Sequence, residues 1–127
     1  MAIKAIPVGA VKEYTSRYDS EEFKTVFTLK ALDAVTFMEL ADRASTSGPT
    51  RLNLEVVRNG LVDCTGLFDE VGNPVEFKKE EIVTFYGKKE VASWDFLKYI
   101  PPNVINELAE EIIKTSQLSE EARKNLD

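Results

Sequence analysis

Residues 23–44 read FKTVFTLKALDAVTFMELADRA, and within this stretch the pattern changes from alternation to helical spacing. Over residues 23–30 the side chains alternate between two faces, and one of these faces carries Phe27 and Leu29. A period of two predicts a half-buried strand. Upstream, residues 11–18 are rich in β-branched and aromatic residues and predict a second strand. With a polar turn between them, the two strands are expected to form an antiparallel hairpin.

The segment after this hairpin is expected to be helical. Asp33 is suited to cap a helix over residues 34–44, because its carboxylate can accept a free N–H of the first turn. The apolar stripe of that helix would consist of Phe37, Leu40, Ala41 and Ala44. After a loop over residues 45–49, residues 50–59 fit either a strand or a helix. We favour a helix that ends with Gly60 in the left-handed conformation.

The second half of the chain predicts further helices around an irregular region. Residues 61–77 have no regular pattern, and turn-forming residues cluster at positions 69–74. Residues 80–86 and 89–99 predict two short helices, the first of which Gly87 would end.

The longest predicted helix covers residues 102–116 and starts at a proline, which the first turn of a helix tolerates. Its apolar side would consist of Val104, Leu108, Ala109, Ile112 and Ile113. We therefore expect an α+β fold, in which an N-terminal antiparallel β-hairpin packs on a mainly α-helical bundle. The chain should form one domain over residues 1–127, with flexible ends at residues 1–10 and 118–127.

The charge, the apolar runs and the cysteine count argue against several classes of protein. Of the 127 residues, 22 are acidic and 16 are basic, so the formal net charge is −6. A negative chain repels phosphate backbones, which argues against nucleic-acid binding. We expect neither a secretory leader nor a membrane-spanning segment, because no apolar run is long enough. The single cysteine, Cys64, permits no internal disulfide and fits the cytoplasm.

The sequence offers little catalytic chemistry. It contains no histidine, which removes the commonest general base and the usual metal ligand. Acidic pairs such as Glu110-Glu111 are adjacent in sequence, and neighbours on a helix diverge too far to share a proton. Cys64 is expected to be a small buried residue. We therefore predict a protein that is not an enzyme and has no metal or cofactor. The alternative, an enzyme that uses carboxylates, needs two acidic side chains in one pocket.

Three residues are candidates for contact with a partner protein: Trp94, Leu108 and Ile112. Trp94 is the only tryptophan, and aromatic side chains often anchor protein interfaces. Leu108 and Ile112 lie on the apolar side of the last long helix. Periodicity identifies an apolar side, but it does not tell whether that side meets the chain's own core or another chain. Both interpretations therefore stay open for all three residues.

Three segments in this order carry a broader pattern. They are TVFTLKAL at residues 25–32, NGLVDCTGLFDEVGNPV at residues 59–75, and a last stretch that opens with IPP at residues 100–102 and closes with QLSEEARKN at residues 117–125. The order resembles the tail assembly chaperones of long-tailed bacteriophages. In that family a strand feeds a helical domain, an Asp-x-x-Gly-x-Pro segment follows, and a helix and a short polar coda close the chain. One departure is that the family usually has a tryptophan where Cys64 and Thr65 stand here.

The resemblance implies a specific role. Such proteins are made in the cytoplasm of the infected host cell, bind the tape measure protein, recruit tail tube subunits and are absent from the finished virion. Two other classes of interaction protein remain as alternatives. One is a virion structural protein, such as a head–tail connector or tail adaptor, which would persist in the particle. The other is a small regulator or anti-defence protein that binds one host target.

Overall fold

The computed structural model describes residues 11–19, 24–84 and 87–116, and in these residues strands and helices form an α+β fold. The expected flexible ends, residues 1–10 and 118–127, lie outside the described residues. In chain order the elements are β1 (Val11–Thr15), β2 (Val26–Lys30), α1 (Ala34–Ser47), α2 (Pro49–Gly60), β3 (Leu61–Thr65), β4 (Lys79–Thr84), β5 (Gly87–Ala92), α3 (Trp94–Leu97) and α4 (Pro102–Thr115).

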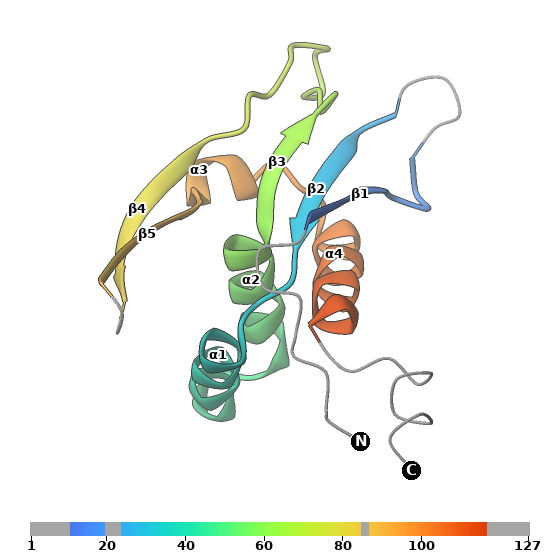
Figure 1. Cartoon of the computed structure of the whole chain (residues 1–127). Helices are drawn as coiled ribbons and strands as arrows, with labels where there is room; N and C mark the ends of the chain where they lie inside the picture. Colours follow the sequence, from blue (N-terminus) through green and yellow to red (C-terminus); the bar gives the residue numbers. More distant parts are fainter. Residues whose placement is uncertain (1–10, 20–23, 85–86, 117–127) are drawn as a thin grey trace.

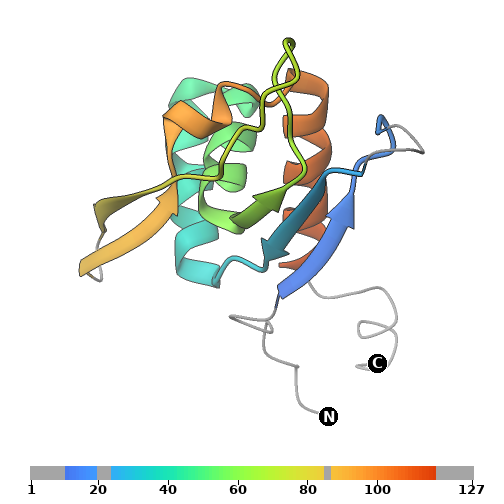
Figure 2. The same ribbon diagram turned by 90° about the horizontal axis from the view of Figure 1, so that it is seen from above.

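The described strands form two antiparallel sheets. A three-stranded sheet has the order β1-β2-β3, and β4 pairs with β5 in a separate two-stranded hairpin. Figures 1 and 2 show α2 and α4 side by side against one face of the three-stranded sheet, and α1 packs on the far side of α2. The β4–β5 hairpin extends away from this body at one side (Figure 1).

The predicted N-terminal hairpin is confirmed. β1 and β2 pair in an antiparallel register that runs from Val11 opposite Lys30 to Thr15 opposite Val26. Phe27 and Leu29, on the predicted apolar face of β2, are almost completely buried. Most of the polar turn between the strands lies outside the described residues.

The predicted helix after β2 is also confirmed and is longer than expected. The carboxylate of Asp33 accepts hydrogen bonds of 2.8 Å from both the amide and the hydroxyl of Thr36, so Asp33 caps α1. The helix continues to Ser47. In place of the expected loop over residues 45–49, a single residue, Gly48 with a φ of 91°, connects α1 to the next helix. Pro49 then starts α2 directly, because proline lacks the N–H that would be unpaired in a first turn.

The favoured helical interpretation of residues 50–59 is confirmed by α2, but its expected ending is wrong. Gly60 is not among the described glycines with positive φ, and the cap is Leu61 in an extended conformation. A Cβ placed on Gly60 would lie 2.7 Å from Cδ1 of Ile112. Glycine is therefore required at this position by the close approach of α2 to α4 and not by a left-handed backbone.

Two expectations for the second half of the chain are wrong. Residues 61–65 form strand β3 instead of an irregular segment, and they pair with β2. The short helix expected at residues 80–86 is absent from the described residues there, and the one expected at residues 89–99 is reduced to α3, Trp94–Leu97. Instead β4 and β5 pair from Lys79 opposite Ala92 to Thr84 opposite Gly87. β-Branched residues such as Ile82 favour this extended pairing.

The predicted turn within residues 69–74 is confirmed. The carboxylate of Asp69 accepts hydrogen bonds from the backbone amides of Val71, at 3.0 Å, and Asn73, at 2.9 Å. Phe68 and Pro74 form an antiparallel bridge across the turn. The predicted last long helix is confirmed as α4.

A buried carboxylate holds α4 to the first strand. Glu107 on α4 is 4% exposed and accepts hydrogen bonds from the hydroxyl of Tyr14, the hydroxyl of Ser16 and the backbone amide of Arg17. Burial raises the pKa of Glu107, but the bonds from Ser16, Arg17 and Tyr14 outweigh burial and leave the pKa below its ordinary value. Glu107 is therefore an ionised structural anchor.

A second polar contact joins the end of α4 to the chain between β2 and α1. The hydroxyl of Ser116 accepts a hydrogen bond of 2.8 Å from the amide of Leu32 and donates one of 2.6 Å to the carbonyl of Ile112. Ser116 and Leu32 are both buried, so the contact satisfies an amide that would otherwise have no partner in the core.

Candidate protein-contact surface

Two of the three predicted contact residues lie in the core. Leu108 and Ile112 both have 0% exposure and belong to the buried cluster that unites α2, α4 and the three-stranded sheet. The apolar side of α4 therefore meets the chain itself, which is one of the two interpretations that the sequence left open. Neither side chain contributes to an exposed surface in this fold.

The third predicted residue, Trp94, lies at the edge of the core. Its side chain is partly buried and packs against the core cluster. Two guanidinium groups from α2 lie over its ring, that of Arg58 at 4.5 Å from the ring centroid and that of Arg51 at 5.5 Å. These are cation–π contacts, which stabilise the ring within its own chain. The structure therefore gives Trp94 an intramolecular role.

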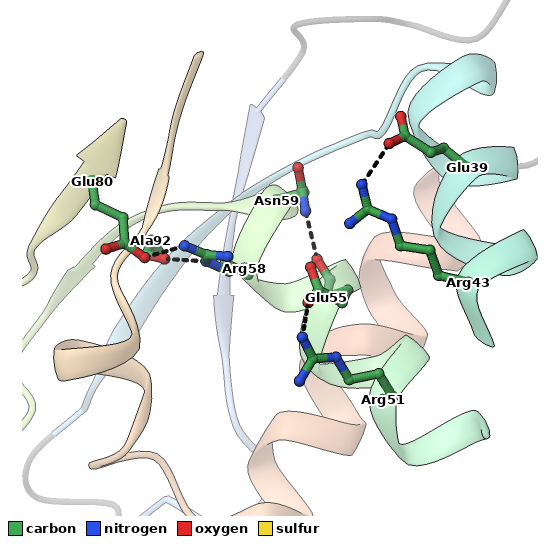
Figure 3. Close-up of polar contacts among 8 residues, drawn as sticks. All are labelled: Glu39, Arg43, Arg51, Glu55, Arg58, Asn59, Glu80 and Ala92. Carbon is green, nitrogen blue, oxygen red and sulfur yellow. Dashed lines mark hydrogen bonds and ion pairs between the residues drawn. The ribbon is translucent and has the colours of Figure 1, made fainter. Parts of the chain in front are cut away.

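Arg58 also joins the β4–β5 hairpin to α2. Its guanidinium forms an ion pair with Glu80 on β4 and donates a hydrogen bond of 3.3 Å to the carbonyl of Ala92 at the end of β5 (Figure 3). Arg51, about two helical turns earlier on α2, pairs instead with Glu55 on the same helix at 2.9 Å. Arg58 thus contacts Trp94, Glu80 and Ala92 together.

An exposed apolar surface lies on α1, and the sequence analysis did not identify it. Val35 is 47% exposed and Met38 is 66% exposed, whereas Leu40 on the other side of the helix is buried against the core. A shallow hollow of about 570 Å³, wide open to solvent, is lined by the described residues Ala34, Val35, Met38 and Glu39. We call these four residues the α1 surface. Their spacing of three places Val35 and Met38 next to each other on the helix.

The signal for the α1 surface was present in the sequence. The predicted stripe of this helix, which includes Phe37 and Leu40, accounts for the side that packs inward. Val35 and Met38 fall outside that stripe, so an apolar pair was left without a place in the core. Other large apolar side chains are also exposed, among them Val71 in the 69–74 turn and Val83 on β4. Tyr99 and Tyr18 each line a described pocket singly, whereas Val35 and Met38 line one together.

The described residues offer no reactive thiol or metal cluster. Cys64 is buried, and burial together with the charge of Asp63 raises the pKa of its thiol to about 12. The thiol therefore stays protonated at neutral pH, where a thiolate would be the nucleophile. Among the described residues, no three His, Cys, Asp or Glu side chains are grouped so that they could hold a metal ion.

Comparison with protein-family models, with curated proteins and with solved structures gave no match. Among the described helices, none combines the length and apolar character that crossing a membrane requires.

Proposed function

We propose that the protein is a tail assembly chaperone of a long-tailed bacteriophage, which binds an apolar helical segment of the tape measure protein through the α1 surface. It would act in the cytoplasm of the infected cell and help to recruit tail tube subunits. The resemblance of three sequence segments to this family is one support. The structural observation that carries the proposal is the exposed pair Val35 and Met38, which lines an apolar hollow.

The α1 surface suits a partner that is itself helical. An amphipathic helix binds a groove through apolar side chains spaced three or four residues apart. Methionine is flexible and polarisable, so Met38 can adapt to side chains of different shape along a long partner. A tape measure segment that exposes apolar side chains before tube assembly needs such a cover. The net charge of −6 would keep a complex with many copies of the chaperone soluble.

The test uses two variants of the α1 surface, Val35→Asp and Met38→Asp. Both side chains are exposed, so each variant should fold, which a thermal melt followed by circular dichroism verifies. Tagged protein is captured from infected cells and the bound tape measure protein is quantified by mass spectrometry. We expect about tenfold less tape measure protein with either variant, since a charge in the interface removes the burial of one apolar side chain. Val83→Asp is the matched control, because Val83 is 80% exposed and lies on β4.

The same infection distinguishes the alternatives. A chaperone should be missing from purified virions, whereas a connector or adaptor should be present there in a fixed ratio to other particle proteins. Capture of a single host protein without tape measure protein would indicate a regulator. Equal recovery of tape measure protein with Met38→Asp and Val83→Asp would exclude the α1 surface as the binding site.

A further inference from the structure

A second hollow, of about 220 Å³, adjoins the α1 surface and is rich in lysine. It lies between the β2–α1 connection, the end of α2 and the tip of the β4–β5 hairpin. Charged residues from three parts of the chain line it: Lys30, Asp33, Glu39, Lys88 and Lys89. We call it the lysine hollow. It collects three cationic side chains in a protein whose net charge is −6.

The two carboxylates of the lysine hollow already have partners. Asp33 caps α1 through its two bonds to Thr36. Glu39 pairs with Arg43 on the next turn of α1 at 2.6 Å (Figure 3). Both carboxylates keep their negative charge and attract the ammonium of Lys89, although neither forms an ion pair with a lysine within the described residues.

The lysines of the hollow have fewer ion pairs and hydrogen bonds than its carboxylates. Lys88 lies 3.6 Å from Glu81 across the β4–β5 hairpin. Neither Lys30 nor Lys89 takes part in any ion pair or side-chain hydrogen bond found for the described residues. Burial and the charges of Lys30 and Arg43 lower the pKa of Lys89, and together they outweigh the charges of Asp33 and Glu39, which raise it. An anion placed between these two ammonium groups would offset their repulsion and replace part of the water that Lys89 has lost.

The lysine hollow and the α1 surface share a wall. Glu39 lines both, and the α1 residues of the two sites interleave along one helix, with Val35 and Met38 on one side and Asp33 and Thr36 on the other. If a helix of a partner protein covers the α1 surface, one side of that partner helix would therefore lie next to the lysine hollow.

We propose that the lysine hollow receives the carboxylate of a glutamate or aspartate on the flank of the partner helix whose apolar side covers Val35 and Met38. This inference rests on the proposed function and names the chemistry of the partner: an amphipathic helix with an acidic residue beside its apolar stripe. The carboxylate lies between Lys30 and Lys89 and forms the ion pairs that these lysines lack within the described chain. The apolar contacts supply affinity, and the acidic residue fixes the register and direction of the helix.

The test compares two synthetic helical peptides by isothermal titration with the full chain. One peptide has leucine and methionine along one side and glutamates along the flank, and the other has glutamine in place of every glutamate. We expect the glutamate peptide to bind about fivefold more tightly at low salt, as befits a partly buried ion pair. The ratio should approach one near 1 M salt, where the screening length is about 3 Å.

Three variants assign the effect to its residues. Lys30→Gln and Lys89→Gln should each reduce the preference for the glutamate peptide and leave affinity for the glutamine peptide unchanged. Lys98→Gln is the matched control, because Lys98 is an exposed lysine beside α3 that pairs only weakly with Asp95 at 3.9 Å. This variant should keep the full preference. Met38→Asp should weaken both peptides equally, since it acts on the apolar side.

The outcomes separate the two proposals. Equal affinity for both peptides, or a preference that survives in Lys30→Gln and Lys89→Gln, would overturn the role of the lysine hollow and leave the α1 surface intact. Binding that survives in Met38→Asp would contradict the α1 surface instead, and the absence of binding by either peptide would contradict both. A titration with inorganic phosphate alone tests whether the lysine hollow binds a small anion without a peptide. Saturation of the Lys30 and Lys89 signals well below 1 mM in nuclear magnetic resonance spectra would reassign the hollow to small anions.

Discussion

The hydroxyl of Tyr14 on β1 donates a hydrogen bond of 2.8 Å to the carboxylate of Glu107 on α4, across 93 positions of the sequence. Burial, this hydrogen bond and the negative charges of Glu107 and Glu111 raise the pKa of Tyr14 to about 12. The same bond helps to hold the pKa of Glu107 below its ordinary value of 4.5. The two groups thus stabilise each other in one protonation state, phenol with carboxylate.

The first prediction concerns acid stability. A carboxylate whose pKa is lowered by folding stabilises the fold above its unfolded pKa, and that stability is lost as the pH falls through the folded pKa. We expect Glu107→Gln to lower the free energy of unfolding at pH 7 by about 2 kcal/mol, because three donors lose a charged acceptor. The difference should shrink as the pH falls below 4.5 and through the lower folded pKa of Glu107. Urea unfolding at several pH values measures this, with the exposed Glu13→Gln as control. A constant difference from pH 7 down to pH 2 would contradict the assignment.

The second prediction concerns the core side of α4. We expect Leu108→Ala and Ile112→Ala each to cost about 2–5 kcal/mol of stability, since both side chains are fully buried and leave a cavity. Met38→Ala, on the exposed α1 surface, should change stability by less than about 0.5 kcal/mol. Denaturant unfolding measures all three. A small cost at Leu108 and Ile112 with loss of partner binding would restore their interpretation as contact residues.

The third prediction concerns the contact between Gly60 and Ile112. Alanine normally favours a helix over glycine by about 1 kcal/mol. At position 60 its Cβ would lie 2.7 Å from Cδ1 of Ile112, whose side chain is fully buried. We therefore expect Gly60→Ala to destabilise the protein by about 1–3 kcal/mol. In an Ile112→Ala background the same change should be neutral or stabilising, and a double-mutant cycle measures the coupling. Additive effects would show that the overlap is relieved elsewhere.

The fourth prediction concerns the attachment of the β4–β5 hairpin. Arg58→Ala removes the ion pair to Glu80, the bond to the Ala92 carbonyl and the cation–π contact with Trp94. We expect faster hydrogen exchange over residues 79–92 and a shifted emission from Trp94, while β2 keeps its protection. Arg43→Ala, which removes only the exposed pair with Glu39, should leave the hairpin unchanged. Uniform acceleration across the whole chain with Arg58→Ala would indicate global unfolding instead.

The sequence alone predicted a helix or strand correctly where the spacing of its apolar residues matches the face that the fold buries. The alternation that ends at Phe27 and Leu29, the capping residue Asp33 and the apolar side of α4 each predicted an element that the structure contains. In each of these segments the apolar face that the spacing predicts is the face that packs against the rest of the chain. The fold class follows from them.

Strand β3 escaped prediction because a bulge hides its period. Leu29 pairs with Leu61 and Thr28 pairs with Asp63, so Val62 is an extra residue in the ladder. The buried residues of β3, Leu61 and Cys64, are therefore three positions apart instead of two. Spacing of three is typical of a helix, and only the partner strand reveals the reason for it.

The β4–β5 hairpin was misassigned for a different reason. In β4 the exposure alternates, so that Ile82 and Thr84 are half-buried while Val83 is exposed, but charged residues occupy much of the alternation. No apolar face marks β4, because the buried apolar residues of the hairpin, Val91 and Ala92, lie at the end of β5. The two candidate sites differ in how far the sequence alone could predict them. Val35 and Met38 could be identified from the sequence as surplus apolar residues, whereas the meeting of Lys30 with Lys89 depends on the hairpin that local patterns did not predict.

The bonds from α4 to the first strands also set the order of events during synthesis. The ribosome makes α4 after every other described element, and only then do Glu107 and Ser116 reach Tyr14 and Leu32. Until that moment α4 cannot cover the apolar faces of α2 and β2 against which it packs in the folded chain. A stalled or shortened chain that stops before residue 102 would therefore be a substrate for proteases and host holdases, and cooperative folding would begin only once the last helix leaves the exit tunnel.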